Sequence, residues 1–309
     1  SRIPKVNAKD DCFIISTKLL ESAGIVYALG TSVRAFTEEG DAMMVMQPVY
    51  YPFSEVIKND GRRLVNCQLR YENNHYSIDF EKMEKMIQEE GVKALIFCNP
   101  HNPVGRVWTR EELERVAEIC LKYNVIWMVD EMHCDFIFPG HTFTSCMNLD
   151  EKYRQILALY SSPGKTFNVA GLQPANIIIP NEELRKKYQW ANTQAAYSQG
   201  SLMGQLAVKV CYTKGADWVD ELVEYIYENV KYMSQYVKEN FPKAKMVEPE
   251  GTYLVWVDFS GYGFSNEELE HLRDKYAEIV VKENGEVVKG NTAVIDFKGV
   301  VDGKTLEGV

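Results

Sequence analysis

The sequence predicts an α/β protein built on a doubly wound, mostly parallel β-sheet. Three observations support this prediction. Short apolar segments recur along residues 40–180, amphipathic helical segments alternate with them, and polar residues stand where two of the apolar segments end. Continuously apolar strands are typical of a parallel sheet that is covered on both faces. Such sheets bind ligands beyond the carboxyl ends of their strands, so we expect the functional site there.

Six segments are expected to form strands. Several of them are continuously apolar, which predicts burial on both faces of the sheet. Their lengths suit strands better than helices. The expected strands span residues 43–47, 63–69, 94–98, 125–130, 155–160 and 176–179.

Two helices have recognisable first residues. Thr109 followed by Glu112 forms a capping box, which predicts a helix that runs to about Lys122. Asp79 is the expected cap of a second helix, which runs through about Gln88.

A longer helix is expected over residues 217–240. Apolar and aromatic residues recur in it at helical spacing, and such a stripe ordinarily packs in the core. The stripe consists of Trp218, Leu222, Tyr225, Ile226 and Val230.

The composition narrows the class of protein. The chain has 309 residues, of which 46% are hydrophobic and 25% charged, as in ordinary globular proteins. The net charge of -10 argues against nucleic acid or anionic membrane as a partner. No apolar stretch approaches the ~20 residues of a membrane span, and residues 1–5 do not begin a signal peptide. We therefore expect a cytoplasmic protein.

The cysteines predict neither a disulfide framework nor a metal site. There are seven, which are scattered and form no C-x-x-C motif. We interpret them as reduced thiols of a cytoplasmic protein. His133, Cys134 and Asp135 are adjacent, but neighbouring residues on a strand point to opposite faces, and no second cluster exists. We therefore predict no bound metal.

The C-terminal segment differs from the rest of the chain. Residues 277–309 are rich in Val, Lys, Glu and Gly. Residues 283–286 are expected to form a hairpin-like turn, residues 292–297 a strand, and Asp302-Gly303 another turn. This pattern predicts a short β-rich tail.

Three polar residues outline a site for pyridoxal phosphate. Lys165 lies among small and hydroxyl residues, Asp130 ends an apolar strand, and Asn102 lies between two prolines. Pyridoxal phosphate needs a lysine for covalent attachment, a carboxylate beside its ring nitrogen, and a donor to its ring oxygen. Tyr50 is a candidate to stack on the ring. His133 is a candidate to approach the side of the ring oxygen.

Each of these residues also has a plainer interpretation. Lys165 could be a solvated surface lysine, and Asp130 a helix cap or turn residue. Asn102 could serve only the turn, Tyr50 could be an ordinary core or surface tyrosine, and His133 a core histidine.

Several longer stretches resemble a known family. Residues 24–271 are similar to pyridoxal-phosphate enzymes of the aspartate aminotransferase fold, also called fold type I. Within that family they resemble the cystathionine β-lyase-like branch, which includes MalY and PatB. The matching stretches are residues 34–41, 47–53, 98–106, 129–135, 165–173 and 251–256.

The resemblance implies a role for each site residue. Lys165 would hold the cofactor as a Schiff base, Asp130 would pair with the ring nitrogen, and Asn102 would donate to the ring oxygen. Tyr50 would stack on the ring. The phosphate would be contacted by Ser162 and by the backbone around Val26 and Tyr27.

Two positions favour the lyase branch of the family. His133 replaces a tyrosine that many aminotransferases carry, and Gln173 stands where many carry a phosphate-binding arginine. The implied reaction is carbon–sulfur β-elimination on an amino acid such as cystathionine or a cysteine S-conjugate, carried out by a homodimer. An aminotransferase and a non-catalytic cofactor-binding regulator, or an inactive fragment, remain the alternatives.

The resemblance also divides the chain into ranges. Residues 24–240 would form the large domain, and residues 241–271 only the start of the small domain. Residues 1–23 resemble nothing in the family, and residues 272–309 resemble the start of the prolyl isomerase domain of trigger factor. The family's carboxylate-binding arginine would lie in the part of the small domain that is not represented. We therefore expect cofactor binding with weak or absent turnover, from a fusion whose central piece is the lyase large domain.

Overall fold

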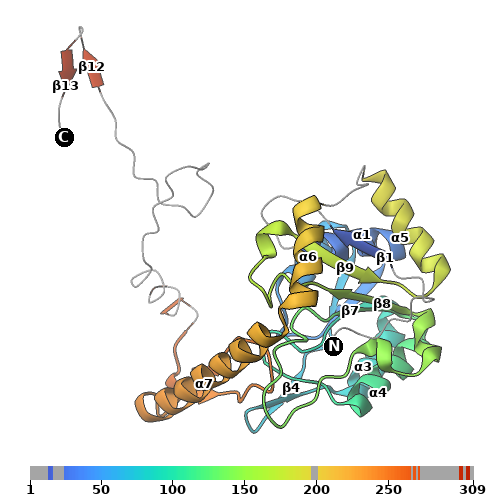
Figure 1. Ribbon diagram of the computed structural model, residues 1–309. Coiled ribbons are helices and arrows are strands. Elements are labelled where there is room, and N and C mark those ends of the chain that lie inside the picture. Colours follow the sequence, from blue (N-terminus) through green and yellow to red (C-terminus); the bar gives the residue numbers. More distant parts are fainter. Residues whose placement is uncertain are drawn as a thin grey trace. The chain divides into compact units, whose positions relative to one another are not determined.

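The computed structural model describes residues 13–16, 24–195, 201–265, 267–268, 271, 299–301 and 304–306. It divides into two compact units, Ser1–Tyr262 and Gly263–Val309, each of which is considered by itself. The first unit contains a seven-stranded sheet with helices on both faces (Figure 1). The α/β class predicted from the sequence is thus confirmed.

The sheet is mostly parallel, as expected. Its strand order is β1-β9-β8-β7-β6-β2-β3. The five strands from β8 to β3 run parallel, whereas β9 is antiparallel to β8 and β1 is antiparallel to β9. All six expected strands are present, and β1 is an addition. The strands are β1 Phe13–Ser16, β2 Ala42–Val45, β3 Arg63–Asn66, β6 Val92–Cys98, β7 Ile126–Asp130, β8 Leu157–Ser161 and β9 Pro174–Ile178.

The helices begin where the capping residues predict. Thr109 accepts a hydrogen bond from the amide of Glu112, whose side chain accepts one from the amide of Thr109. Asp79 accepts from the amide of Lys82. The α-helices are α1 Gly24–Phe36, α2 Pro52–Asn59, α3 Phe80–Glu90, α4 Arg110–Lys122, α5 Glu182–Gln194, α6 Leu202–Lys214 and α7 Ala216–Asn240. Short 3-10 helices span Cys146–Asn148, Glu151–Gln155, Ala170–Leu172 and Ser260–Tyr262.

The core lies on both faces of the sheet. Phe97 and Trp127 belong to one buried cluster, which also contains residues of α3 and α4. Ile96 and Met128, their neighbours along the strands, belong to a second cluster with residues of α1, α2 and α5. Successive strand residues point to opposite faces, so each central strand is buried on both sides. The rigid sheet then fixes the positions of the loops at its carboxyl edge.

Helix α7 corrects one expectation. Of the expected stripe, Val230 is buried and Leu222 and Ile226 are half-buried, whereas Trp218 is 47% exposed and Tyr225 is 67% exposed, so the two aromatic residues do not pack in the core. The buried residues of the helix are Val219, Val230 and Val237. They lie seven and eleven positions apart, which places them on a single narrow side of the helix. Trp218 lies at the edge of this contact, with one side of its ring stacked on Phe167 at 5.5 Å, centroid to centroid, and the rest in solvent.

Three two-stranded antiparallel sheets complete the described structure. They pair β4 Arg70–Glu72 with β5 His75–Ser77, β10 Lys245–Met246 with β11 Val257–Asp258, and β12 Gly299–Val301 with β13 Lys304–Leu306.

The pair β12 and β13 belongs to the second unit and flanks residues 302–303, where a turn is expected. Those two residues, the expected turn at 283–286 and the expected strand at 292–297 lie outside the described residues. The expected domain ranges stay predictions. Among the helices of the described part, none is long and apolar enough to cross a membrane.

Candidate cofactor site

The predicted site residues come from loops that follow three neighbouring strands. One loop follows β6 and contains Asn102, the second follows β7 and contains His133, and the third follows β8 and contains Lys165. Strands β6, β7 and β8 are adjacent and parallel, with Asp130 of β7 aligned with Cys98 of β6. The carboxyl ends of adjacent parallel strands meet at one edge, which is where such sheets bind ligands.

Asp130 is a buried carboxyl with few hydrogen-bond donors around it among the described residues. It is 4% exposed and accepts one hydrogen bond among the described residues, at 2.9 Å from the backbone amide of Met132 to its Oδ1. Burial raises the pKa of Asp130 to about 7, while the Met132 amide and the positive charge of Lys165 each lower it. A buried carboxylate is costly unless a cation or further donors accompany it. A protonated ring nitrogen would be such a cation.

Lys165 lies in a tight loop that is anchored to the neighbouring one. The amide of Phe167 donates to the carbonyl of Pro163 at 2.9 Å. Thr166 is fully buried, and its Oγ1 donates to Oδ2 of Asp135 at 2.8 Å. The lysine itself is half-buried, and its charge lowers the pKa values of both Asp130 and His133. Its charge is therefore felt at both groups.

Ser162 stabilises the same loop. Its hydroxyl is buried, donates to the carbonyl of Pro174 at 2.5 Å, and accepts from the amide of Gly164 at 2.9 Å. A Cβ on Gly164 would lie 3.0 Å from this Oγ, so a larger residue would press on the hydroxyl. The hydroxyl proton of Ser162 is thus committed to Pro174, and its contact with a phosphate stays a prediction.

Asn102 and His133 meet across two of the loops. Nδ2 of Asn102 lies 3.3 Å from Nε2 of His133. An amide nitrogen can only donate, so Nε2 accepts and the histidine proton resides on Nδ1. That Nδ1 is buried and has no partner among the described residues. Burial and then the charge of Lys165 lower the pKa of His133 to about 3, so the ring is neutral at neutral pH.

Tyr50 joins the same group through its backbone. Its amide donates to the carbonyl of Asn102 at 3.0 Å, and its half-buried ring packs edge-on against Phe53. Burial raises the pKa of Tyr50, and the nearby charges of Tyr51 and then Asp130 add to the effect. Lys165, Asp130, Asn102, His133 and Tyr50 are therefore brought together at one end of the sheet.

The predicted phosphate residues Val26 and Tyr27 lie in the first turn of α1 and are half-buried. The first turn of a helix presents backbone N–H groups without intrahelical partners, an arrangement that favours anions. Helix α1 is joined to the sheet by Ser32, whose hydroxyl accepts from Tyr160 of β8 at 2.6 Å. The contact of Val26 and Tyr27 with a phosphate stays a prediction.

Sequence reasoning missed two residues beside this group. The ring of Tyr253 lies 5.2 Å from that of His133 and 5.3 Å from that of Phe136, centroid to centroid. The preceding Thr252 is fully buried and donates its amide to the carbonyl of Phe136 at 2.8 Å, which holds Tyr253 in place. Membership in the stretch 251–256 could have indicated Tyr253. The second missed residue is Glu131, whose partners are distant in sequence.

The side chains present fit pyridoxal phosphate. A half-buried amine, a buried carboxyl with one local donor, and an asparagine amide stand near one another, and the buried Nδ1 of His133 has no partner among the described residues. These are the groups that the aldehyde, ring nitrogen and ring oxygen of this cofactor require. Within the described ranges, no group of three or more His, Cys, Asp or Glu residues could hold a metal ion.

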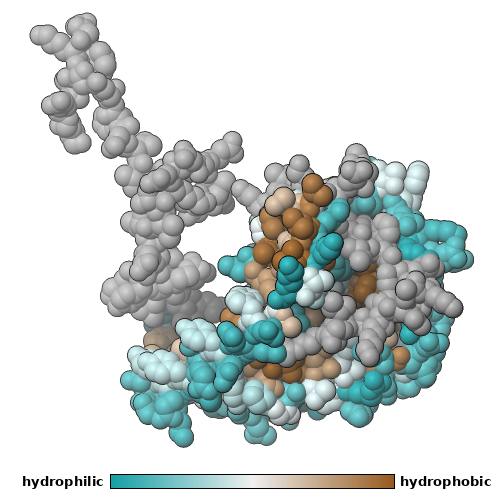
Figure 2. Space-filling model, viewed as in Figure 1, coloured by the Kyte–Doolittle hydropathy of each residue, from teal (hydrophilic) through white to brown (hydrophobic). Residues whose placement is uncertain are grey.

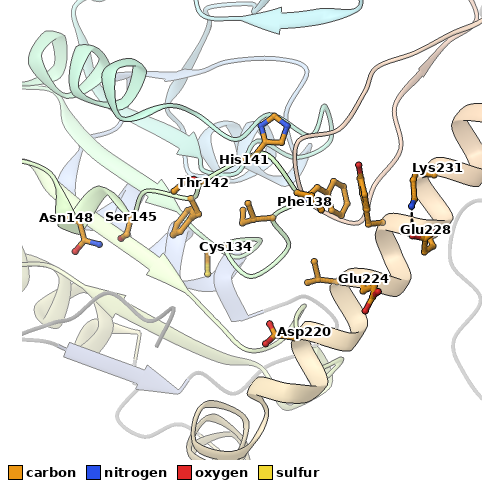
Figure 3. Close-up of a pocket in the computed structure, with 15 residues that line it drawn as sticks. Cys134, Phe138, His141, Thr142, Ser145, Asn148, Asp220, Glu224, Glu228 and Lys231 are labelled. Atoms are coloured by element: carbon orange, nitrogen blue, oxygen red, sulfur yellow. Dashed lines mark ion pairs between the residues drawn. The ribbon is translucent and has the colours of Figure 1, made fainter.

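A cavity of about 970 Å³ lies elsewhere, between α7 and the loop that follows β7. Figure 3 shows Cys134, His141 and Ser145 on the loop side, with Asp220 and Glu224 on α7. None of the predicted cofactor residues lines it. Its volume suits a small molecule, but it is a separate cavity from the group formed by Lys165, Asp130 and Asn102.

The fold and the site define a class of protein that comparison with known families identifies. The profile of the family described as aminotransferase class I and II matches residues 15–291. The chain therefore belongs to this family of pyridoxal-phosphate enzymes of fold type I, and its relatives place it with the PatB and MalY branch. The resemblance predicted from the sequence is confirmed.

Three relatives illustrate this placement. Cystathionine beta-lyase PatB of Bacillus subtilis is 37% identical over 84% of this chain and 67% of its own length. The structure of cystalysin from Treponema denticola, which contains pyridoxal 5'-phosphate, is 36% identical, with a TM-score of 0.79 over 82% of this chain and 64% of its own. The PLP-bound C-S lyase from Staphylococcus hominis is 30% identical, with a TM-score of 0.74 over 83% and 63%. The chain thus spans about two thirds of the length of these relatives.

Proposed function

We propose that this chain binds pyridoxal phosphate through Lys165 and acts in carbon–sulfur β-elimination on an amino acid such as cystathionine or a cysteine S-conjugate. The main support is Asp130, a buried carboxyl beside Lys165 at the carboxyl edge of the sheet. The similarity to a cystathionine beta-lyase and to PLP-bound C-S lyases supports the substrate class.

The residues present would divide the work as follows. When bound, pyridoxal phosphate supplies an electron sink for the negative charge that develops at the substrate Cα. Asp130 would favour a proton on the ring nitrogen by its negative charge, and Asn102 would orient the ring by donating to its oxygen. Tyr50 would pack on the ring face. Lys165 would hold the cofactor covalently through its Nζ, and the same amine, when free, would take the proton from the substrate Cα.

His133 contributes by staying neutral. A protonated imidazole beside Lys165 would add a second positive charge to a buried site, and the lowered pKa of His133 prevents this at neutral pH. The neutral ring orients the Asn102 amide through Nε2. The leaving group would be the β-thiolate, and the remaining three-carbon product would hydrolyse to pyruvate and ammonia.

The proposal is tested by product analysis with cystathionine. We expect thiol and pyruvate in equal amounts from protein loaded with pyridoxal phosphate, and neither from Lys165→Ala under the same conditions. Because the chain spans about two thirds of its relatives, a low rate agrees with the proposal. Cofactor binding at Lys165 without any thiol release would contradict the lyase assignment and support a non-catalytic binding protein.

An aminotransferase is the second candidate. A PLP-bound structure from Clostridium difficile, 38% identical to this chain, is described as a putative aminotransferase. Transfer of the amino group would require an added keto acid and would release no thiol. Amino-acid formation that depends on a keto acid, without thiol release, would therefore favour this candidate over the lyase.

We also propose that the protein acts as a homodimer. Exposed apolar side chains gather along α6 (Figure 2), namely Leu202, Met203, Leu206 and Val210. An apolar face of this kind is costly in water unless another surface covers it. Sedimentation of the wild type should give twice the mass of one chain, and Leu206→Glu should shift it to the monomer. A monomeric wild type would contradict the proposal.

A further inference from the structure

Glu131, next to Asp130, is a buried carboxyl that joins three segments of the chain. It is 1% exposed. Its Oε2 accepts from the hydroxyl of Ser145 at 2.8 Å, and its Oε1 accepts from the amide of Cys146 at 2.8 Å. Nδ2 of Asn99 lies 3.4 Å from the same Oε1. We call this set of contacts the Glu131 clamp.

The first effect of the clamp is to close the loop 131–146 at its base. Both ends of this loop are held by one carboxyl group, because Glu131 begins it and Ser145 and Cys146 end it. The loop carries His133, two residues from the clamp, and Asp135, which accepts from Thr166 beside Lys165. Its position thus decides where the histidine stands relative to the lysine.

The second effect is to join this loop to the one that contains Asn102. Asn99 begins that second loop, and its backbone N–H donates to the carbonyl of Asp130 at 2.9 Å. The second loop is a compact turn. The backbone N–H of His101 donates to the carbonyl of Arg106 at 2.8 Å, and that of Gly105 donates to the carbonyl of His101 at 2.9 Å. A turn closed in this way moves as a unit, so the position of Asn99 sets that of Asn102.

The two loops are therefore joined in two places, at their base through Asn99 and nearer the site through Asn102. Asn99 meets Glu131 at the base, and Asn102 meets His133 where Nδ2 and Nε2 lie 3.3 Å apart. We propose that Glu131 is a positioning residue, which through the clamp holds Asn102 and His133 in the geometry that receives the cofactor ring. The proposal deepens the proposed function and rests on it, but Glu131 itself touches neither cofactor nor substrate.

The chemistry of the clamp predicts which substitutions disturb it. Glu131→Ala leaves the Cys146 amide and the Ser145 hydroxyl without their shared acceptor in a buried place, which favours rearrangement of the loop, while Nδ2 of Asn99 keeps its 3.0 Å hydrogen bond to the carbonyl of Thr144. Glu131→Gln keeps one oxygen for Cys146 and Asn99, and the hydroxyl of Ser145 can turn to accept from the new amide. Ser145→Ala removes one donor to Glu131 together with the acceptor of the Met147 amide, and leaves the Cys146 and Asn99 contacts with Glu131 in place.

The first readout uses the protein without cofactor and does not depend on enzyme function. Nitrogen-15 NMR of the imidazole rings, with the His133 signal assigned by comparison with His133→Gln, reports which ring nitrogen carries the proton. In the wild type and in Glu131→Gln we expect His133 protonated on Nδ1. In Glu131→Ala we expect the two His133 ring-nitrogen signals to shift toward the average of both tautomers. We also expect the pH at which His133 titrates to rise toward about 6.5.

The second readout is the affinity for pyridoxal phosphate, followed by the change in cofactor absorbance. We expect the apparent Kd to be about tenfold larger in Glu131→Ala and about two- to threefold larger in Ser145→Ala than in the wild type. In Glu131→Gln it should equal the wild-type value. The matched control is Leu113→Ala, which opens a cavity in the core under α4 without removing any hydrogen-bond donor or acceptor of the clamp, and should leave both readouts unchanged.

Each outcome decides the matter. Wild-type tautomer and affinity in a folded Glu131→Ala protein would overturn the proposal, as would equal losses in Leu113→Ala. If Glu131→Ala does not fold, Ser145→Ala decides in the same way, because an unchanged His133 signal and affinity there would overturn the clamp. If the wild type binds no pyridoxal phosphate at all, the proposed function fails, while the NMR readout still judges the clamp separately.

Discussion

Asp130 and Glu131 are adjacent buried carboxyls with opposite surroundings. Burial raises the pKa of each to about 7. Glu131 receives hydrogen bonds from Ser145, Cys146 and Asn99, whereas Asp130 receives one among the described residues, from Met132. The comparison separates two uses of a buried carboxyl. The protein satisfies Glu131 with its own donors to hold loops together, and it leaves Asp130 able to pair with a ligand cation.

The strand period explains how neighbours come to differ so much. Successive residues of β7 point to opposite faces of the sheet. Glu131 reaches the side where Cys146 belongs to the cluster packed against α3 and α4. Asp130 lies beside Cys98 and Tyr160, which belong to the cluster of α1, α2 and α5. Two adjacent residues thus place one carboxyl, Asp130, toward the cofactor site and the other, Glu131, among the donors of the clamp.

Neutralising Asp130 should have the largest effect on function. Asp130→Asn keeps the hydrogen bond from the Met132 amide but removes the charge that holds a proton on the ring nitrogen. We expect turnover to fall about 10²–10³-fold, the range seen when one electrostatic partner of a reacting centre is removed. Steady-state release of pyruvate from cystathionine measures this loss. A similar loss in Glu131→Gln would erase the distinction between the two carboxyls.

Truncating Glu131 should instead have the larger effect on stability. Glu131→Ala leaves the buried Cys146 amide and Ser145 hydroxyl unpaired, so we expect the free energy of unfolding to fall by about 3 kcal/mol. Glu131→Gln should lose less than about 1 kcal/mol. Urea unfolding of both variants, monitored by circular dichroism, measures the difference. Equal stability of the two variants would show that the three contacts contribute nothing to the fold.

The pH dependence of stability sharpens the same comparison. Burial raises the pKa of Glu131 from its usual 4.5 to about 7, so the folded protein binds this proton more tightly than the unfolded chain. The stability that this proton contributes is fully present below pH about 4.5 and is lost as pH rises through about 7. Glu131→Gln has no such proton. Relative to this variant, the free energy of unfolding of the wild type should therefore fall by on the order of 3 kcal/mol between pH about 4.5 and about 8.

That difference is obtained from urea unfolding curves of the two proteins recorded across the pH range. Taking the wild type relative to Glu131→Gln removes the contributions of Asp130, His101 and His133, which titrate in both proteins. Parallel curves for the two proteins at every pH would show that Glu131 keeps its ordinary pKa in the fold, and that burial does not dominate its surroundings.

The smallest effect is expected at the contact between the loops nearer the site. Asn102→Ala removes one donor to the ring oxygen and the partner of Nε2 of His133. One hydrogen bond contributes about 1 kcal/mol, so the affinity for pyridoxal phosphate should weaken about fivefold. Absorbance titration measures it. The matched control is Asn74→Ala, which removes an asparagine from an exposed turn and should leave the affinity unchanged.

Much of the fold could be predicted from residue patterns. The apolar strands, the capping residues Thr109 and Asp79, and the grouping at the carboxyl edge follow from local periodicity and from the geometry of parallel sheets. The exposure of Trp218 and Tyr225 could not be predicted, because helical spacing identifies a stripe but not whether anything packs on it.

The site was predictable only in part for a similar physical reason. Lys165 and Asp130 each have a distinctive local setting, and family resemblance extends to Asn102 and Tyr50. Glu131 has no local signal, because its partners Ser145 and Cys146 are brought to it by the closure of a loop. Contacts of that kind depend on the folded path of the chain.

Borohydride reduction of the protein mixed with pyridoxal phosphate, followed by peptide mass mapping, tests the central claim most directly. The account predicts a phosphopyridoxyl adduct on Lys165, which Lys165→Ala abolishes and Asp130→Asn weakens. No adduct, or label spread over many surface lysines of both the wild type and Lys165→Ala, would contradict the cofactor site and the function proposed from it.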